Sequence, residues 1–162
     1  MADIDKRGTD ELVQVVSFQL GQEEFGIDIL KVQEINRMVE ITKVPQAPFY
    51  CEGIINLRGK VIPVINLRKK FELDEREWDK NTRILVCDVA GNVIGMIVDS
   101  VAEVLKIPHS TIEPTPDIVT SVNSDYISGI AKLEDKLLIF LDVSKIAAEA
   151  GELVAEQEPA AV

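Results

Sequence analysis

The sequence predicts a mainly β protein built from two small five-stranded barrels side by side, with short helices and one helix at the C-terminus. The first reason is an internal repeat, in which residues 50–69 match residues 126–145. The second is composition, since apolar residues make up 46% of the chain and aromatic residues only 5%. Valine, isoleucine and leucine dominate the apolar residues, and such side chains suit a pleated, half-buried surface. The third is a series of short apolar runs separated by glycine turns. Because each copy holds about five strands, a small barrel is the arrangement that buries its apolar face and removes most strand edges.

The chain contains the same residue pattern in two copies. Tyr50 and Gly53 in the first copy match Tyr126 and Gly129 in the second. At the same spacing, further pairs match: Ile54 and Ile130, Leu57 and Leu133, Asn66 and Asp142, and Lys69 and Lys145. A second series of pairs lies upstream: Val15 and Ile84, Gly26 and Gly95, Ile29 and Val98, Val32 and Val101, Glu34 and Glu103, and Ile35 and Val104. The chain is therefore a duplication of one β-rich unit, with a few extra residues inside the second copy.

The first copy opens with a predicted hairpin. Residues 12–20 alternate and are rich in valine, residues 21–24 are typical of a turn, and residues 25–29 return as the partner strand. The apolar residues at positions 29, 30, 32 and 35 then have helical spacing for about one turn. We expect this turn to lead into a strand over residues 34–42.

Two proline residues separate this hairpin from the next. Residues 47–53 have room for one helical turn, which Gly53 would end. Residues 54–57 and 60–67 then form a hairpin whose tip is Arg58-Gly59. Pro63 lies inside the returning strand and predicts an edge strand or a bulge there.

The second copy follows the same plan after a charged connection over residues 71–82. Residues 83–89 form a strand, and residues 93–107 form a long strand or a bent pair of strands. Residues 108–124 contain Pro114 and Pro116 and predict a long loop.

The last elements are a hairpin and a helix. Residues 126–133 and 136–141 pair across a turn at Glu134-Asp135. Asp142 is suited to cap a helix over residues 143–150, which Gly151 would end.

These boundaries divide the chain into three parts. Residues 1–11 form a flexible N-terminus, residues 12–150 one two-barrel domain, and residues 151–162 a disordered acidic tail. The barrel halves fall at about 12–75 and 80–150, although an exchange of strands or helices between them is possible.

The formal net charge is −11. This charge argues against nucleic acid or an anionic membrane as a partner, because phosphate binding needs a basic surface. No stretch has the roughly 18 uninterrupted apolar residues of a membrane span, and the polar first residues do not resemble a signal peptide. We therefore expect the cytoplasm as the location.

The sequence offers little for catalysis or metal binding. Cys51 and Cys87 form no C-x-x-C pair, and we expect buried, reduced thiols. His109, the one histidine, lies in a polar loop with no nucleophile motif nearby. The sequence has no metal-ligand cluster and no glycine-rich nucleotide loop, so we expect no cofactor, no metal and no enzymatic activity.

Three carboxylates are candidates for an acid–base pair, namely Asp28, Asp88 and Asp99. Each occupies a turn or a strand end, where exposed carboxylates are common, and an acid–base role is the weaker interpretation.

Arg58 interrupts the apolar pattern at a hairpin tip, where the second copy has Glu134-Asp135. It is either a generic charged turn residue or a recognition residue, since a guanidinium offers several donors and a stacking face. Glu34 is matched by Glu103, so a shared structural role competes with recognition. Val32 and Ile35 are equally consistent with core positions.

The segment from Gly53 to Ile65, with Asn56, Leu57, Arg58 and Gly59 at its centre, closely resembles the CheW family of chemotaxis coupling proteins. So does the upstream segment from Gly26 to Ile35, and the resemblance covers about residues 12–150. The family often has Asp where this chain has Asn66.

The resemblance implies two intertwined five-stranded SH3-like barrels and a non-catalytic adaptor. The implied partners are the cytoplasmic tip of methyl-accepting chemotaxis receptors and the regulatory domain of a CheA-type histidine kinase. The family's receptor surface lies in the groove between the barrels, and it maps onto Val32, Glu34, Gly53 and Arg58. No kinase-contact residues can be assigned. The implied location is the cytoplasm, with recruitment to membrane receptor arrays through these partners.

Two alternatives remain open at this point. One is an adaptor of a chemosensory pathway that controls pilus motility or gene expression instead of swimming. The weaker one is a small carboxylate-dependent hydrolase that uses Asp28, Asp88 or His109.

Overall fold

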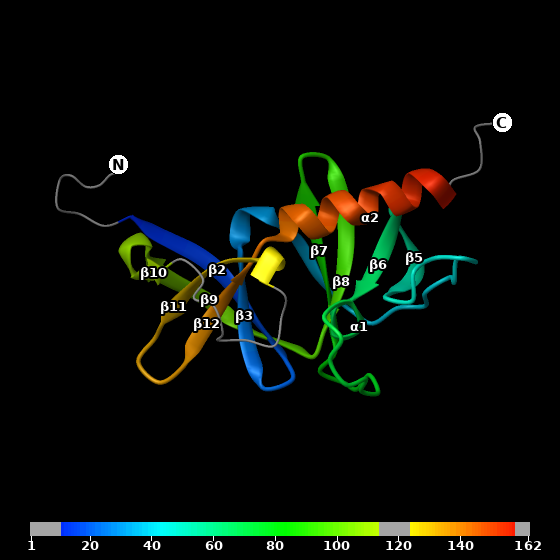
Figure 1. Cartoon of the computed structure of the whole chain (residues 1–162). Helices are drawn as coiled ribbons and strands as arrows, with labels where there is room; N and C mark the ends of the chain where they lie inside the picture. Colours follow the sequence, from blue (N-terminus) through cyan, green and yellow to red (C-terminus); the bar gives the residue numbers. More distant parts are fainter. Residues whose placement is uncertain (1–10, 114–123, 158–162) are drawn as a thin grey trace.

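The structure is a computed structural model, and it describes residues 11–113 and 124–157. Two β-sheets lie side by side, and a long helix lies above the five-stranded one (Figure 1). The six-stranded sheet has the order β10-β11-β12-β3-β2-β9. Its strands are β2 (Leu12–Leu20), β3 (Glu23–Asp28), β9 (Ser100–Pro108), β10 (Ile112–Glu113), β11 (Ile127–Lys132) and β12 (Leu137–Leu141).

The second sheet has five strands in the order β4-β7-β8-β6-β5. Its strands are β4 (Val32–Arg37), β5 (Cys51–Leu57), β6 (Lys60–Asn66), β7 (Arg83–Val89) and β8 (Asn92–Val98). The predicted mainly β class with two subdomains is therefore confirmed, with a short sixth strand, β10, in one sheet.

The sequence repeat is a structural repeat as well. Each sheet contains one parallel pair at the same position of its copy: Gly26 lies opposite Phe140, and Gly95 lies opposite Val64. Backbone contacts repeat too, since the amide of Asn66 donates to Tyr50 and the amide of Asp142 donates to Tyr126, each at 2.8 Å. The two subdomains are thus copies of one unit.

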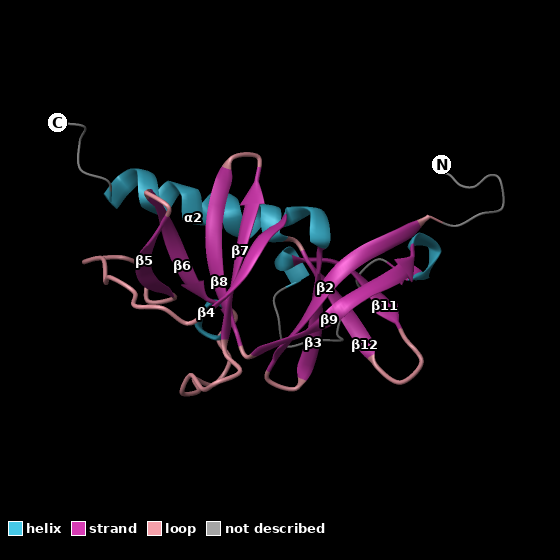
Figure 2. Ribbon diagram, turned by 180° about the vertical axis from the view of Figure 1, so that it is seen from behind, coloured by secondary structure: helices cyan, strands magenta, loops and turns pink. Residues whose placement is uncertain are grey.

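Neither sheet is formed by one contiguous half of the chain, whether residues 12–75 or residues 80–150. Each sheet contains strands from both halves. Strands β2 and β3 pair with β9 and β12, whereas β4 pairs with β7, β6 pairs with β8, and β5 joins the same sheet through β6. One cause lies at Asp99, the single residue between β8 and β9. Because one residue is too short a loop for a hairpin, β9 continues into the other sheet (Figure 2).

One hydrophobic core is shared by both sheets and the C-terminal helix. It brings together Phe18 and Phe25 from the six-stranded sheet, Leu85 and Met96 from the five-stranded sheet, and Ile146 from the helix. Each sheet also has a smaller cluster of its own. Since the largest cluster joins both sheets, the two subdomains pack as one body.

Helix α2 (Val143–Gln157) follows β12 of one sheet but packs on β6, β7 and β8 of the other (Figure 1). The side chain of Asp142 accepts a hydrogen bond from the amide of Ser144 at 3.1 Å, as expected for a cap. The predicted helix end at Ala150 was wrong, because α2 continues to Gln157. One interior glycine costs a helix only about 1 kcal/mol, and the residues that follow Gly151 are mostly good helix formers.

Three local predictions also need correction. Strand β4 ends at Arg37 instead of continuing to residue 42, and Thr42 makes only an isolated bridge to Ile54. Gly53 lies inside β5 and ends no helical turn. Pro63 lies in an interior strand, but the parallel ladder to β8 begins at Val64, so the missing amide of Pro63 is needed by neither neighbour's ladder.

The short helices and connections complete the fold. They are η1 (Ile29–Lys31), α1 (Leu67–Lys70), η2 (His109–Thr111) and η3 (Ser124–Tyr126). The hairpin tip at Arg58-Gly59 is confirmed. Residues 1–10, most of the predicted 108–124 loop and residues 158–162 lie outside the described residues. In the described part, no helix has the length and apolar character to span a membrane.

Candidate functional site

Arg58 and Glu34 contact each other directly. The Nη1 atom of Arg58 lies 2.6 Å from Oε2 of Glu34, and Nη2 lies 3.4 Å from Oε1. The Arg58 side chain is 76% exposed and that of Glu34 is 21% exposed. The hydrogen bond from Arg58 lowers the pKa of Glu34, and the same bond raises the pKa of Arg58. The pair is therefore charged at neutral pH, with the guanidinium facing solvent.

This ion pair joins the two ends of the five-stranded sheet. Glu34 lies on β4, the first strand in the sheet order, and Arg58 follows β5, the last one. The bridge between Thr42 and Ile54 connects the same two regions, with hydrogen bonds of 2.9 Å and 2.8 Å. Together these contacts close the sheet into a barrel. Arg58 itself adopts a φ of 52°, a left-handed conformation that suits a tight hairpin tip.

Gly53 is required by the same closure. Its φ is 146°, and a Cβ atom at this position would overlap the carbonyl oxygen of Thr42 and lie 2.8 Å from Cγ2 of Ile41. The pairing between β5 and β6 shifts register at this point, between Cys51 and Gly53. Gly53 therefore lets the backbone of residues 41–42 approach β5 closely.

Val32 is the first residue of β4, in the same sheet as Glu34. It follows η1, its amide donates to the carbonyl of Ile29, and its half-buried side chain packs against the shared core. Ile35, which the sequence allowed as a core position, is instead 44% exposed. The structure thus brings Glu34 and Arg58 into contact and places Gly53 and Val32 in the same sheet, with Val32 packed against the shared core.

The carboxylates considered for catalysis serve structural roles. Asp28 caps η1 by accepting from the amide of Leu30 at 2.9 Å, and Asp88 accepts from the amide of Gly91 at 3.1 Å. Among the described residues, no group of histidine, cysteine and carboxylate side chains is arranged to hold a metal ion. Nothing in this geometry assembles an acid–base pair.

Asp99 is the most connected of these carboxylates. It binds Nε and Nη2 of Arg68 at 2.8 Å and 2.6 Å, Arg76 at 3.2 Å and the amide of Gly21 at 2.9 Å. Burial alone would raise the pKa of Asp99, but the hydrogen bonds from Arg68 and Gly21 outweigh burial and lower it. Because Gly21 belongs to the six-stranded subdomain and Arg68 to α1, this network fastens the two subdomains at their crossover. Sequence reasoning considered Asp99 only as a catalytic acid and missed this role.

A second cluster holds α2 in place. The Nζ atom of Lys70 lies 2.7 Å from Oε1 of Glu149 and 4.0 Å from the ring centre of Tyr50. Tyr126, the repeat partner of Tyr50, donates its hydroxyl to Glu149 at 3.2 Å. Burial lowers the pKa of Lys70, but the bonds to Glu149 and Tyr126 outweigh burial and raise it. Equivalent residues of both copies thus meet at one lysine.

Both cysteines are free thiols. Burial raises the pKa of Cys87 to about 12, and burial also raises the pKa of the half-buried Cys51. Neither thiol is therefore activated as a nucleophile.

Comparison with known proteins decides the family. The family model described as the CheW-like domain matches residues 14–151. The chain belongs to the CheW-like family. Relatives include the chemotaxis protein CheW of Klebsiella aerogenes, which is 38% identical over 129 residues, or 80% of this chain and 78% of the relative. CheW of Treponema pallidum is 37% identical over 85% of this chain and 83% of its own length.

The fold comparison agrees. The crystal structure of the scaffolding protein TtCheW from Thermoanaerobacter tengcongensis superimposes with a TM-score of 0.76. It is 44% identical in sequence and covers 80% of this chain and 88% of its own. The predicted resemblance to the CheW family is therefore confirmed, and the two subdomains are SH3-like. The roles of Val32, Glu34, Gly53 and Arg58 in binding remain predictions.

Proposed function

We propose that this CheW-like chain is a non-catalytic adaptor that couples methyl-accepting chemoreceptors to a CheA-type histidine kinase. The observation that supports this most strongly is the CheW-like match over nearly the whole described chain. The carboxylates considered for catalysis are also engaged in caps and ion pairs. An adaptor needs only two binding faces on one rigid body, and the shared core supplies the rigidity.

The proposed receptor face contains Val32, Glu34, Gly53 and Arg58. Arg58 is its recognition residue, because its exposed guanidinium retains free donors after pairing with Glu34. Gly53 acts indirectly, by holding the closure of the barrel on which Arg58 and Glu34 depend. The partner segment would be the helical tip of a receptor, with charged groups that fix its register.

The proposed kinase partner is the regulatory domain of the CheA-type kinase. No residue of this chain is assigned to that contact. Binding both partners tethers kinase to receptor and raises their effective concentration. Signalling then requires that the receptor states differ in how well they hold the active and inactive kinase, which is a coupling free energy between the two sites. The proposed location is the cytoplasm, at membrane receptor arrays.

The test of the receptor face is a charge reversal followed by a charge swap. Arg58→Glu should weaken co-sedimentation with receptor cytoplasmic fragments while the urea midpoint stays close to that of the wild type, because the side chain is exposed. Lys132→Glu, a reversal of an exposed charge on β11, serves as the matched control. If Arg58→Glu unfolds the protein, or binds receptor as the control does, the assignment of Arg58 fails.

The swap Arg58→Glu with Glu34→Arg restores an ion pair of the opposite polarity. It should restore the contact between residues 34 and 58 but not receptor binding, because the partner would meet a carboxylate where it needs a guanidinium. Full recovery of receptor binding would mean that the pair acts only inside this chain.

No observation favours a pathway output other than swimming, or a hydrolase. The output depends on which receptors and which kinase the adaptor serves.

A further inference from the structure

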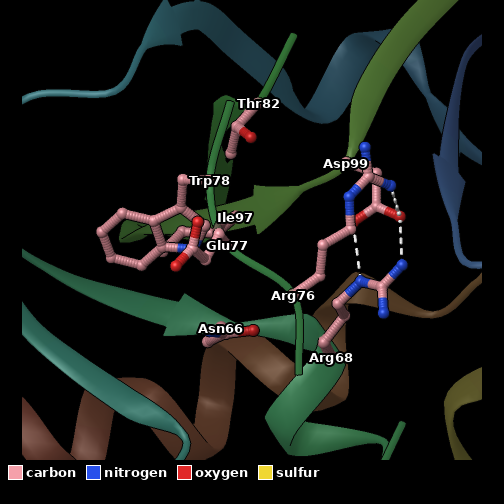
Figure 3. A pocket seen from close by; sticks show the side chains of 8 residues that line it. All are labelled: Asn66, Arg68, Arg76, Glu77, Trp78, Thr82, Ile97 and Asp99. Atoms are coloured by element: carbon pink, nitrogen blue, oxygen red, sulfur yellow. Dashed lines mark hydrogen bonds and ion pairs between the residues drawn. The ribbon is translucent and has the colours of Figure 1, made fainter. Parts of the chain in front are cut away.

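A cavity of about 590 Å³ lies on the five-stranded subdomain, and none of the four residues of the proposed receptor face lines it. Strands β5 and β6, helix α1 and the loop of residues 71–82 surround it. Its lining residues are Glu52, Asn66, Lys69, Glu75, Arg76, Glu77 and Trp78. A smaller pocket adjoins it and shares Asn66, Arg76, Glu77 and Trp78 (Figure 3). The larger volume falls in the range of about 300–1,000 Å³ that small binding sites occupy.

The loop that forms this cavity is fastened on both sides. Arg76 donates to Asp79 at 2.9 Å and to Asp99 at 3.2 Å, and Arg68 donates to the carbonyl of Asp74 at 2.5 Å. At the end of the loop, the amide of Asp79 donates to the hydroxyl of Thr82 at 2.8 Å. The cavity is therefore formed before any partner binds, which lowers the entropic cost of binding.

The cations around the cavity are already paired. Lys69 lies 3.0 Å from Glu52, and Arg76 is shared between Asp79 and Asp99. Glu75 and Glu77, in contrast, have neither an ion pair nor a side-chain hydrogen bond within residues 11–113 and 124–157. Two uncompensated carboxylates thus remain beside the aromatic residue of the loop, and they favour a cationic ligand.

Trp78 supplies the aromatic surface. Its side chain is large, and the residue is 46% exposed although it is apolar. Figure 3 shows its ring and the side chain of Glu77 together on one side of the pocket, while Arg68 and Arg76 converge on Asp99 at the other. An exposed indole next to free carboxylates matches the chemistry that holds an organic cation, by cation–π contact and charge-assisted hydrogen bonds.

We propose that this cavity binds an arginine side chain presented by a peptide segment of a protein partner. A planar guanidinium can stack on the indole of Trp78 while it donates to Glu75 and Glu77. The formal charge of −11 favours approach of a basic segment. Because Trp78 stays half exposed, the cavity is open to solvent, and a side chain that enters from outside fits it better than a wholly enclosed molecule. This site shares no residue with the proposed receptor face, although Glu52 of the cavity is the neighbour of Gly53 on β5.

Trp78 also provides the assay, since it is the only tryptophan of the chain. The full chain is titrated with an acetylated, amidated peptide that alternates four arginines with glycines, and tryptophan emission is recorded. The comparison probe is the same peptide with citrulline, which keeps the shape and loses the charge. We expect a saturable change in emission with the arginine peptide, weakened by added salt, and none with the citrulline peptide.

Two double variants locate the binding. Glu75→Gln with Glu77→Gln should weaken binding of the arginine peptide by about tenfold, the scale expected for two exposed ion pairs. Glu134→Gln with Asp135→Asn removes the same charge from the turn between β11 and β12 and should leave binding unchanged. Far-UV circular dichroism checks that both variants remain folded.

Three outcomes would overturn the proposal. They are an equal response to the citrulline peptide, an equal loss in both double variants, and no saturable response to the arginine peptide. A fourth arm uses free arginine amide. Binding of this small molecule as tight as that of the peptide would overturn the peptide source and indicate a small cationic ligand.

Discussion

The most exacting prediction concerns Gly53→Ala. The change adds one methyl group, yet the added Cβ would overlap the carbonyl oxygen of Thr42 and lie 2.8 Å from Ile41 Cγ2. The residue would also have to keep a φ of 146°, which side chains with a Cβ rarely adopt. The backbone of residues 41–42 must therefore move away from β5.

The expected cost has two parts. Holding a residue other than glycine in this region of φ costs about 1–3 kcal/mol. Moving Thr42 breaks its two hydrogen bonds with Ile54, of 2.9 Å and 2.8 Å, at a net cost of about 1 kcal/mol each. Gly53→Ala should thus lower the free energy of unfolding by about 3–5 kcal/mol, a large fraction of the stability of a small domain.

Urea unfolding followed by circular dichroism measures this loss, and Gly91→Ala is the matched control. Gly91 also has a positive φ, 90°, but an added Cβ there meets no atom within 4 Å. The control should lose only about 1–2 kcal/mol, the cost of the left-handed conformation alone. If Gly53→Ala loses no more than Gly91→Ala, close approach of Thr42 does not explain Gly53, and a direct recognition role would replace it.

Three further predictions test other parts of the fold. Asp99→Asn should lose about 2 kcal/mol of stability at pH 7, because the Arg68 side chain, only 14% exposed, is left without its carboxylate partner. Since the pKa of Asp99 is lowered in the fold, its contribution is present above about pH 4, the unfolded pKa, and is lost as pH falls through the lower folded value; urea midpoints of wild type and variant should therefore converge in acid. Lys70→Met should increase amide hydrogen exchange throughout α2, whereas unchanged exchange would mean that the shared core alone holds the helix. A thiol reagent at pH 8 should modify Cys51 before Cys87 in the folded protein and both at similar rates in urea, because only the fold separates their accessibility; equal rates in the folded protein would contradict the burial of Cys87.

Much of the local structure followed from short-range rules. Alternation and turn residues located β2 and β7 with their observed bounds, and Asp142 was found as a helix cap. These features depend on neighbours within a few residues, which a single sequence displays. The hairpin tip at Arg58-Gly59 belongs to the same class.

The exchange of strands between the sheets could only be left open. Both copies carry the same strands, so the hydrophobic pattern fits pairing within a copy and between copies equally well. The choice depends on how sharply the chain can turn at Asp99, a single residue whose hydrogen bonds reach Arg68 and Gly21. Contacts between residues so far apart in the chain produce no periodic pattern in the sequence.

For the candidate site, the sequence identified individual residues but not the contacts between them. Arg58 and Glu34 were singled out separately, but their contact arises only because the two ends of the five-stranded sheet meet. Gly53 was assigned to the end of a helical turn, since a glycine with positive φ serves helix ends and β-bulges alike. Trp78 was read as part of a connection, because its exposure beside two free carboxylates appears only in the folded loop.

Coupling of receptor to kinase is the function proposed for this chain. The most direct test reconstitutes receptor cytoplasmic fragments, a CheA-type kinase and this chain, and measures co-sedimentation together with kinase autophosphorylation. We predict that the chain brings kinase into the receptor pellet and makes autophosphorylation depend on the receptor, and that Arg58→Glu loses both effects while Lys132→Glu keeps them. Failure of the wild-type chain to bind either partner, or kinase activity that is the same with and without it, would contradict the adaptor function.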